Sequence, residues 1–286
     1  MIRILTDSTA DFTPEQAAAL GVEVVPLRLN FDGESYDDGE LPPDEFYSRL
    51  AACSHLPTTS QPSPDAFLTR FEAAEEAGDQ MVAVLLSSQL SGTYQSATIA
   101  AEGLAGIVLV DSGTATLGLQ LLVRYAAKLR DEGLTAGEIA SRIEAVKEDV
   151  RIFAVIDDLQ YLRKGGRLSG AGAFAGALLG IKPLVQLRDG KVTLAGKARG
   201  MAGAYVALFK MLDGENAIDT SRPFMAGYTG HPHAADPIRR YLTHNLGLHG
   251  FETGHIGPIV GTHAGPGAAG IAYFAKPAGT AEEAAE

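Results

Sequence analysis

The segment DQMVAVLLSSQLSGTYQSATIAAEGL, Asp79–Leu104, contains the structural unit that the first half of the chain repeats. Its first part, up to Ser88, is short and apolar and predicts a buried strand. Its later part predicts a helix. The loop between them is rich in hydroxyl side chains and contains a glycine, Gly92. A buried strand that leads through a polar loop into a helix is typical of α/β proteins with a parallel sheet.

The same alternation of strand and helix runs through residues 1–150. Apolar runs predict four strands, at residues 2–8, 22–31, 79–88 and 106–112. Two helix starts carry the spacing of a capping box, Thr13 with Gln16 and Thr135 with Glu138. We therefore expect an N-terminal three-layer α/β/α domain, residues 1–150, in which helices cover both faces of a parallel sheet.

Three of these strands end in clusters of Ser, Thr and Asp, namely TDSTAD, LSSQLSGT and VDSGTAT at residues 6–11, 86–93 and 110–116. In parallel sheets of this kind, ligands bind beyond the carboxyl ends of the strands. We expect the three polar clusters to meet at one rim of the sheet. An Asp directly after a strand, such as Asp7 or Asp11, is more often a cap than half of an acid–base pair.

Residues 151–280 predict a second domain, a two-layer α/β structure with a mixed sheet. The turn Asp189-Gly190 joins two alternating runs and is the strongest hairpin signal in the chain. We expect the last strands in HIGPIVGTH (255–263) and GIAYF (270–274). The run GAGAFAGALLG (170–180) consists of small and apolar residues and predicts close packing.

Composition excludes several classes of protein. The chain has 286 residues, with 23 Lys and Arg against 35 Asp and Glu, a formal net charge of −12. This charge disfavours nucleic acid and anionic membranes as partners. The longest uncharged apolar run, 169–181, is too short to span a bilayer. A single cysteine, Cys53, fits a reducing compartment, and we expect a cytoplasmic protein without membrane insertion.

Two polar loops are candidate ligand sites. Ser91, Gly92 and Thr93 stand where a helix begins, and free backbone N–H groups at a helix start bind anions. Capping of that helix by Ser91 or Thr93 explains the same residues equally simply. The second loop, residues 58–61, lies between two prolines and is either an ordinary turn or part of a site. The segment around Ser91 lacks the lysine of a phosphate-binding P-loop, so a nucleoside triphosphate is not expected at that helix start.

Other candidates carry positive charge or a histidine. LRKGGRLSG contains Arg167, and GKARG contains Arg199; each is either a solvated surface or a docking patch. His263 lies in a glycine-rich stretch, where a lone histidine is usually structural. The spacing of His231, His233 and Asp236 does not complete a metal site, and we expect no bound metal.

Several separated motifs occur in an order that resembles the DegV family of bacterial fatty-acid-binding proteins. They are TDSTADF, PTTSQPSP, SSQLSGTYQSA, VDSGTAT, LRKGGRLSG, IKPLVQLRDGK and IGPIVGTHAGPGAAG, and together they cover about Ile2 to Phe274. The sequence departs from the family pattern at Gly180, Ala264 and Gln120. These departures leave the preferred acyl length open.

The resemblance implies two α/β domains with a long-chain fatty acid between them, its acyl chain in an apolar tunnel. It implies that Thr59 and Ser91, with Gly92 beside them, bind the carboxylate, and that His263 and Arg199 lie near it. It further implies a carrier without catalytic residues or cofactor, which presents the acid to a separate ATP-dependent kinase similar to dihydroxyacetone kinases.

Arg167 is our candidate for docking the kinase, because it stands at a helix-to-loop junction and its guanidinium offers a planar fork. Two other functions remain open. One is an enzyme of the dihydroxyacetone kinase type with His263 or an acid pair in catalysis, and the other is a sensor or structural binding module for a small anion.

Overall fold

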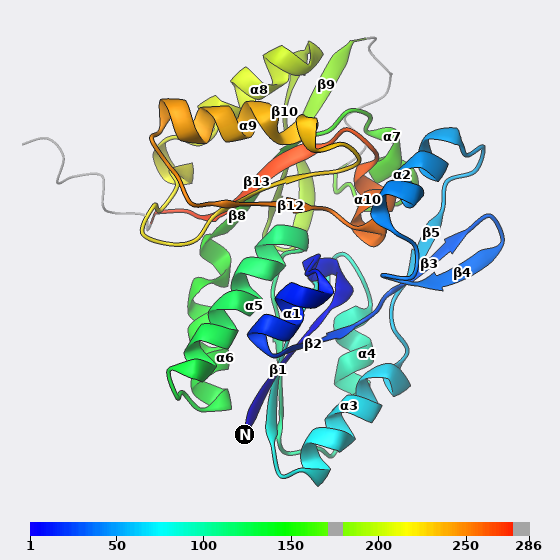
Figure 1. Cartoon of the computed structure of the whole chain (residues 1–286), viewed down its shortest axis with the longest axis vertical. Helices are drawn as coiled ribbons and strands as arrows, with labels where there is room; N and C mark the ends of the chain where they lie inside the picture. The colour runs from blue at the N-terminus through cyan, green and yellow to red at the C-terminus, as the bar shows by residue number, and fades with distance from the viewer. Residues whose placement is uncertain (171–179, 277–286) are drawn as a thin grey trace, which may run out of the picture.

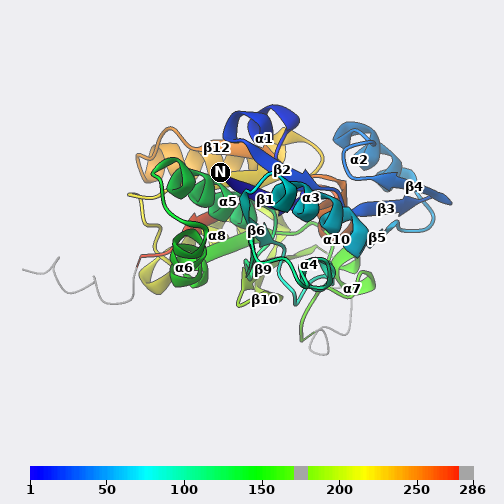
Figure 2. The ribbon, with the colours of Figure 1, turned by 90° about the horizontal axis from the view of Figure 1, so that it is seen from below.

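A four-stranded parallel sheet, ordered β2-β1-β6-β7, organises the N-terminal half in the computed structural model, which describes residues 1–170 and 180–276. Its strands are β1 (Ile2–Asp7), β2 (Val22–Val25), β6 (Gln80–Leu85) and β7 (Ile107–Asp111). One face is covered by α3 (Pro64–Glu76) and α4 (Thr93–Ala100), and the other by α5 (Thr116–Asp131) and α6 (Ala136–Val146). Figure 2 shows these layers from below. The predicted three-layer arrangement is confirmed.

Burial on both faces explains why these strands are almost entirely apolar. Ile4 and Val82 pack toward α5 and α6, whereas Leu5 and Ala83 pack toward α3 and α4, and all four are fully buried. Adjacent residues of a strand point to opposite faces, so a sheet covered on both sides needs apolar residues at every position.

The predicted helix starts are confirmed. Thr13 caps α1 (Pro14–Leu20): its hydroxyl accepts the N–H of Gln16, whose side chain accepts the N–H of Thr13. Thr135 and Glu138 form the same reciprocal pair at α6. Each box satisfies backbone donors that the first turn of a helix leaves free.

A six-stranded mixed sheet organises the C-terminal half, in the order β10-β9-β8-β13-β11-β12. Its strands are β8 (Val150–Val155), β9 (Ile181–Arg188), β10 (Lys191–Arg199), β11 (Met225–Tyr228), β12 (Glu252–His255) and β13 (Ala269–Phe274). The β11–β12 pair is parallel and the other pairs are antiparallel. The hairpin predicted at Asp189-Gly190 is confirmed, with positive φ at both residues (52° and 76°).

Helices cover the outer face of this sheet and leave its inner face toward the first sheet. The covering elements are α8 (Gly200–Lys210), α9 (Asp236–Arg240) and a π-helical turn, Tyr241–Asn245. Leu208 and Ile238 from these helices pack with Phe153 and Ile271 from the strands. Figure 1 shows the second sheet above the first, with α5 reaching up to it.

The strand expected at 255–263 is wrong. β12 ends at His255, and a helix, α10, occupies Pro258–Ala264. Proline at the first position is compatible with a helix because its missing N–H has no intrahelical partner there. Gly265, with φ 73°, ends the helix in a conformation that suits glycine. The apolar residues of this stretch are therefore spaced for a helix, and its short length hid that period.

The strand expected at 22–31 is in fact two strands in different sheets. Pro26, which lacks an N–H for sheet pairing, separates β2 from β3 (Arg28–Phe31). With β4 (Glu34–Asp37) and β5 (Thr58–Ser60), β3 forms a small antiparallel sheet in the order β4-β3-β5. This sheet and α2 (Pro43–Ala52) extend to one side of the molecule (Figure 2). Neither the small sheet nor α2 was predicted from the sequence.

Polar contacts tie the two large sheets together. The Asp11 carboxylate accepts the N–H of Gly257 at 2.9 Å and the hydroxyl of Thr116 at 2.5 Å. At another point Ser87 Oγ donates to the carbonyl of Gly190 at 2.9 Å, and the N–H of Gly190 donates to the carbonyl of Gly113 at 3.0 Å. The hairpin tip of the second sheet is thereby fixed to the rim of the first.

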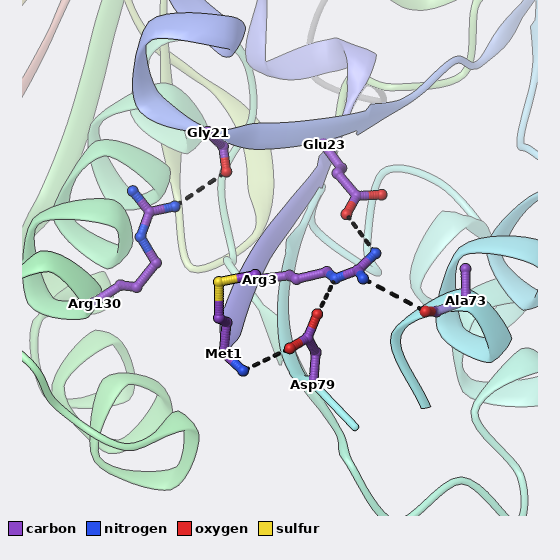
Figure 3. A network of polar contacts seen from close by, with 7 residues as sticks. All are labelled: Met1, Arg3, Gly21, Glu23, Ala73, Asp79 and Arg130. Carbon is purple, nitrogen blue, oxygen red and sulfur yellow. Dashed lines mark hydrogen bonds and ion pairs between the residues drawn. The ribbon is translucent and has the colours of Figure 1, made fainter. Parts of the chain in front are cut away.

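A network at the opposite end of the parallel sheet pins the start of β1 (Figure 3). Arg3 Nε donates to Asp79 at 2.8 Å, and Arg3 Nη1 lies 3.7 Å from a carboxylate oxygen of Glu23. Beside it, Arg130 donates to the carbonyls of Leu20 and Gly21 and so holds the end of α1. These contacts stabilise the N-terminal half far from the rim where polar loops meet.

The remaining elements are short: α7 (Gln160–Lys164) and 3-10 turns at Ser8–Ala10, Lys147–Asp149, Gly214–Asn216 and Pro232–Ala235. Across residues 1–170 and 180–276, no helix combines the length and the apolarity needed to cross a membrane. Most of the run 170–180, for which we predicted close packing, lies outside the described residues. The chain passes from the first large sheet to the second at β8, but a domain boundary at residue 150 stays a prediction.

Candidate functional site

A cavity of about 540 Å³ lies between the inner face of the second sheet and the polar rim of the first. Its volume is within the range of ordinary small-molecule sites, about 300–1,000 Å³. Strand residues of the second sheet form its floor, and α10 and the ends of β1, β6 and α5 supply other walls. Most lining side chains are aliphatic, among them Ile152, Ile156, Leu187, Ile259 and Leu117.

Several polar residues of the cavity come from segments that are distant in the sequence. Thr59 and Gln61 come from β5 and the loop after it, Ser91 and Gly92 from the start of α4, and His263 from α10. The polar clusters after β1, β6 and β7 meet as expected, through hydrogen bonds from the loop after β6 to Asp7 and Asp111, and part of this rim faces the cavity.

Thr59 and His263 form the centre of this polar group. Thr59 Oγ1 lies 2.9 Å from His263 Nε2, within hydrogen-bond distance. Pairing of β5 with β3 places Thr59 opposite Leu29, and Thr59 is less exposed than its neighbours Thr58 and Ser60. The sequence predicted both residues for the site, and the structure brings them into direct contact.

Ser91 and Gly92 lie at the start of α4. Ser91 Oγ accepts the N–H of Thr93 at 3.3 Å and is 2.9 Å from Thr93 Oγ1. The N-cap position is Gly92 and no side chain caps the helix, so the alternative of capping by Ser91 or Thr93 is not found. Ser91 instead accepts the N–H of the first helical residue and lines the cavity. A side chain at Gly92 would collide with Gln61, whose Oε1 would be 2.0 Å from its Cβ. Gly92 thus allows the Gln61 loop to approach the helix.

Arg167 was predicted to project outward and contact a partner, but in the structure it forms part of the cavity wall. It is half-buried, with Nε donating to the carbonyl of Leu90 at 3.2 Å and Nη1 to that of Gly165 at 2.6 Å. Burial lowers the pKa of its guanidinium, but arginine stays charged at neutral pH. Of the described residues that line the cavity, it alone carries a permanent charge.

Arg199, which the resemblance placed near the carboxylate, is elsewhere. It is the last residue of β10, it is exposed, and it is not among the residues that line the cavity. Both arginines stand in short basic stretches of similar composition, so local sequence could not tell which one turns inward. The deciding contacts, to Leu90 and Gly165, involve backbone carbonyls and leave no side-chain signature.

His263 is neutral at physiological pH. Burial, and then the nearby Arg167 charge, lower its pKa from 6.5 to about 4. Its Nδ1 atom is buried and makes no hydrogen bond. Gly165 packs against this edge of the ring: a Cβ at Gly165 would be 2.3 Å from Nδ1. The ring is thus held by packing on one edge and by Thr59 on the other.

The Thr59–His263 pair has the spacing of a nucleophile and its base, but it lacks the third group that orients such a base. The ring nitrogen that would receive an orienting carboxylate is the unpartnered Nδ1. The nearby carboxylates are engaged elsewhere: Asp7 accepts the N–H of Leu86 at 2.7 Å and that of Thr9 at 3.0 Å, as a cap. The site is better arranged to hold an anion than to activate a hydroxyl.

The fold and cavity define an α/β binding protein with two large sheets, an apolar cavity between them and hydrogen-bond donors gathered in part of its wall. A family model described as "Uncharacterised protein, DegV family" matches residues 1–276. The chain is 38% identical over 279 residues to a DegV domain-containing protein of Deinococcus radiodurans, covering 95% of this chain and 97% of that protein. It belongs to the DegV family.

Solved structures agree with this assignment. A Thermus thermophilus DegV family protein described for its fatty acid binding is 33% identical, with a TM-score of 0.86 over 96% of this chain and 99% of that one. DegV of Bacillus subtilis, described as a fatty acid binding protein, is 31% identical with a TM-score of 0.84 and the same coverage. A stearic-acid-binding protein from Eubacterium ventriosum is 28% identical with a TM-score of 0.86, again over 96% and 99%.

Proposed function

We propose that this protein binds a long-chain fatty acid in the cavity between its sheets. The observation that carries the proposal is the division of the cavity wall: Thr59, Ser91, His263 and Arg167 lie in one part, and aliphatic side chains form most of the rest. A fatty acid has the same division, one carboxylate and a long apolar chain. The fatty acids bound by the related solved proteins support this choice.

The polar residues can satisfy a carboxylate removed from water. A buried carboxylate needs hydrogen-bond donors or a cation. Ser91 Oγ and Thr59 Oγ1 can donate hydroxyl protons, and Arg167 supplies the positive charge. Thr59 has a single hydroxyl proton, so it can donate to the carboxylate only when neutral His263 carries its proton on Nε2 and donates to Thr59 Oγ1. In that tautomer His263 orients the Thr59 hydroxyl toward the ligand. In this proposal Arg167 has the role that the family resemblance implied for Arg199.

The acyl chain would supply most of the binding free energy. Burial of one methylene group contributes about 0.8 kcal/mol, so a chain of many methylenes binds tightly without any chemical step. This matches a carrier that needs no catalytic residue and no cofactor.

We further propose that the bound acid is presented to a separate ATP-dependent kinase that forms an acyl phosphate. The charge of the segment 151–199 favours an acidic partner. Residues 151–199 contain nine Lys and Arg against three Asp and Glu, in a chain whose net charge is −12. Arg199 is exposed in this segment, so it replaces Arg167 as the docking candidate.

Mass spectrometry of the purified protein under denaturing conditions tests the binding proposal. We expect long-chain acids to be released in near-equimolar amount, and stripped protein to rebind them but not acetate or phosphate. Binding of short anions without preference for long acids would instead support a small-anion sensor.

The kinase step is tested separately: the acid-loaded protein is mixed with ATP and a dihydroxyacetone-kinase-like protein from the same genome, and acyl phosphate is trapped with hydroxylamine.

A further inference from the structure

A row of very small residues crosses the inner face of the second sheet. Strand register aligns Gly254 of β12 with Gly227 of β11, Gly227 with Gly270 of β13, and Gly270 with Ala154 of β8. Such aligned positions without bulky side chains form a groove that runs across the strands, with about 4.8 Å from one strand to the next. The next aligned residue, Val185 of β9, is larger.

The cavity follows only part of this row. Ala154, Gly270 and Gly227 line it, but Gly254, the next residue in the row, does not. The side chain of Leu117 lies between the two. A Cβ at Gly227 would be 2.4 Å from Leu117 Cδ1, and a Cβ at Gly254 would be 2.7 Å from Leu117 Cδ2. Leu117 therefore fills the groove where the cavity ends.

The backbone before Leu117 is held in an unusual conformation. Thr116 has φ 47°, a left-handed value that is rare for a β-branched residue. Its hydroxyl donates to Asp11, which also binds the N–H of Gly257 just before α10. These contacts fix the first turn of α5 against the second sheet and direct Leu117 to the glycine pair. Strain of this kind persists only where surrounding contacts impose it.

Leu117 is also separated from the polar part of the cavity. It adjoins the start of α10 through the Asp11 contacts, whereas His263 is six residues further along, near the end of that helix. A helical rise of about 1.5 Å per residue separates the two ends by roughly 9 Å. A ligand whose carboxylate lies at His263 would therefore direct its chain along the groove toward Leu117.

We propose that Leu117 is the specificity-determining residue that closes the acyl groove and sets the longest chain the cavity accepts. The inference rests on the proposed fatty-acid function. Loss of the Leu117 side chain beyond Cβ would open the groove over Gly227 and Gly254, by about one strand spacing. Longer saturated acids would then place their terminal methylenes in this extension.

Competition of saturated acids of 12 to 20 carbons against a fluorescent fatty acid tests the proposal in stripped protein. In Leu117→Ala we expect the affinity of the longest acids relative to the shorter ones to rise about tenfold for every two methylenes gained. Leu117→Val, which retains more packing, should shift the preference in the same direction but less. It keeps the test valid if the alanine variant does not fold.

Leu119→Ala is the matched control, because Leu119 is fully buried on the same helix but does not line the cavity. It should lower stability and leave the chain-length preference unchanged. An unchanged preference in folded Leu117 variants would overturn the inference. Failure of the wild type to bind any of the acids would overturn the proposed function instead, so the two failures are distinguishable.

Discussion

Protonation of the His263 imidazole makes the stability of the protein depend on pH. Its pKa is about 4 in the folded protein and near 6.5 when exposed to water. Between these values the unfolded chain binds a proton at this position and the folded chain does not. The free energy of unfolding therefore rises with pH across this window and falls as the pH drops toward 4.

His263→Asn should remove this contribution. We expect the stability difference between wild type and variant to grow by up to about 3 kcal/mol between pH 4.5 and pH 7, in favour of wild type at the higher pH. Urea unfolding of lipid-free protein across this range measures it. The comparison with the variant cancels the opposite trend from Asp11, whose pKa burial raises to about 8. Parallel curves for the two proteins would contradict the assignment.

Thr59→Ala should weaken binding of a long-chain acid by about 1–3 kcal/mol, or roughly tenfold to a hundredfold, because a buried carboxylate loses one donor. Titration with a fluorescent fatty acid measures the change. Thr58→Ala is the control: Thr58 is the preceding residue of β5, but it is exposed and does not line the cavity. Equal affinities in the two variants would exclude Thr59 from the carboxylate site.

Arg167→Ala and Arg199→Ala should separate the two roles proposed for arginine. Loss of a half-buried cation beside the carboxylate should lower fatty-acid affinity at least tenfold, with partial recovery in Arg167→Lys. Arg199→Ala should keep that affinity and reduce acyl-phosphate formation with a matching kinase. The same titration and a hydroxylamine assay measure both effects. Unchanged acid binding in Arg167→Ala would return Arg167 to the docking surface.

Site residues were predictable from the sequence where the residue type and its neighbouring motif together indicate a binding role. Thr59, Ser91, Gly92 and His263 were predicted for the site and all line the cavity. Arg167 and Leu117 were not, since their positions depend on contacts to backbone and to glycines from distant strands. A hydrogen bond to a backbone carbonyl, or a contact with a distant glycine, leaves no pattern in the sequence around the residue that makes it.

Among the elements, α10 carries the site and depends on close packing with α2. Gly261 allows this approach: a Cβ there would be 2.3 Å from Tyr47 Oη. Tyr47 in turn donates to the carbonyl of Ile256, one residue before the loop glycine that starts α10. The small sheet and α2, which were not predicted, therefore support the helix that holds His263.

Gly261→Ala should force α2 away from α10 and destabilise the protein by about 1–3 kcal/mol, with weaker fatty-acid binding. Gly137→Ala is the matched control, since Gly137 is exposed in helix α6 and has open space at the Cβ position. It should stabilise the protein by about 0.5–1 kcal/mol. Thermal unfolding of both variants measures these effects, and equal behaviour would show that the Tyr47 contact relaxes freely.

Elements with a clear period or cap were predictable, and short ones were not. The parallel sheet, the capping boxes and the Asp189-Gly190 hairpin follow from apolar period and turn chemistry. The strands β3, β4 and β5 have three or four residues each, too few to show a reliable alternation. The residues of α10 were wrongly predicted as a strand for the same reason, since the helix has only seven residues.

For the whole molecule, the cavity lies where the two large sheets meet, so a ligand there contacts both. A ligand that binds only the folded state stabilises it by about 2.7 kcal/mol at a concentration of 100 Kd. Loaded protein should therefore unfold at a higher temperature than stripped protein, in one transition that includes both sheets. Calorimetry checks this, and a first-sheet transition insensitive to lipid would show that the halves unfold independently.

The size of the cavity has a consequence for release of the proposed ligand. At about 24 cal/mol per Å³, a dry void of about 540 Å³ would cost on the order of 10 kcal/mol. That is comparable to the entire net stability of an ordinary domain, about 5–15 kcal/mol. A protein that kept this shape with the cavity dry would lose much of its stability, whereas entry of water at the polar part of the wall would lower that cost. For the proposed fatty-acid function, we therefore expect ligand release to be coupled to inward collapse, entry of water or prompt rebinding, so that the dry empty form is rarely populated.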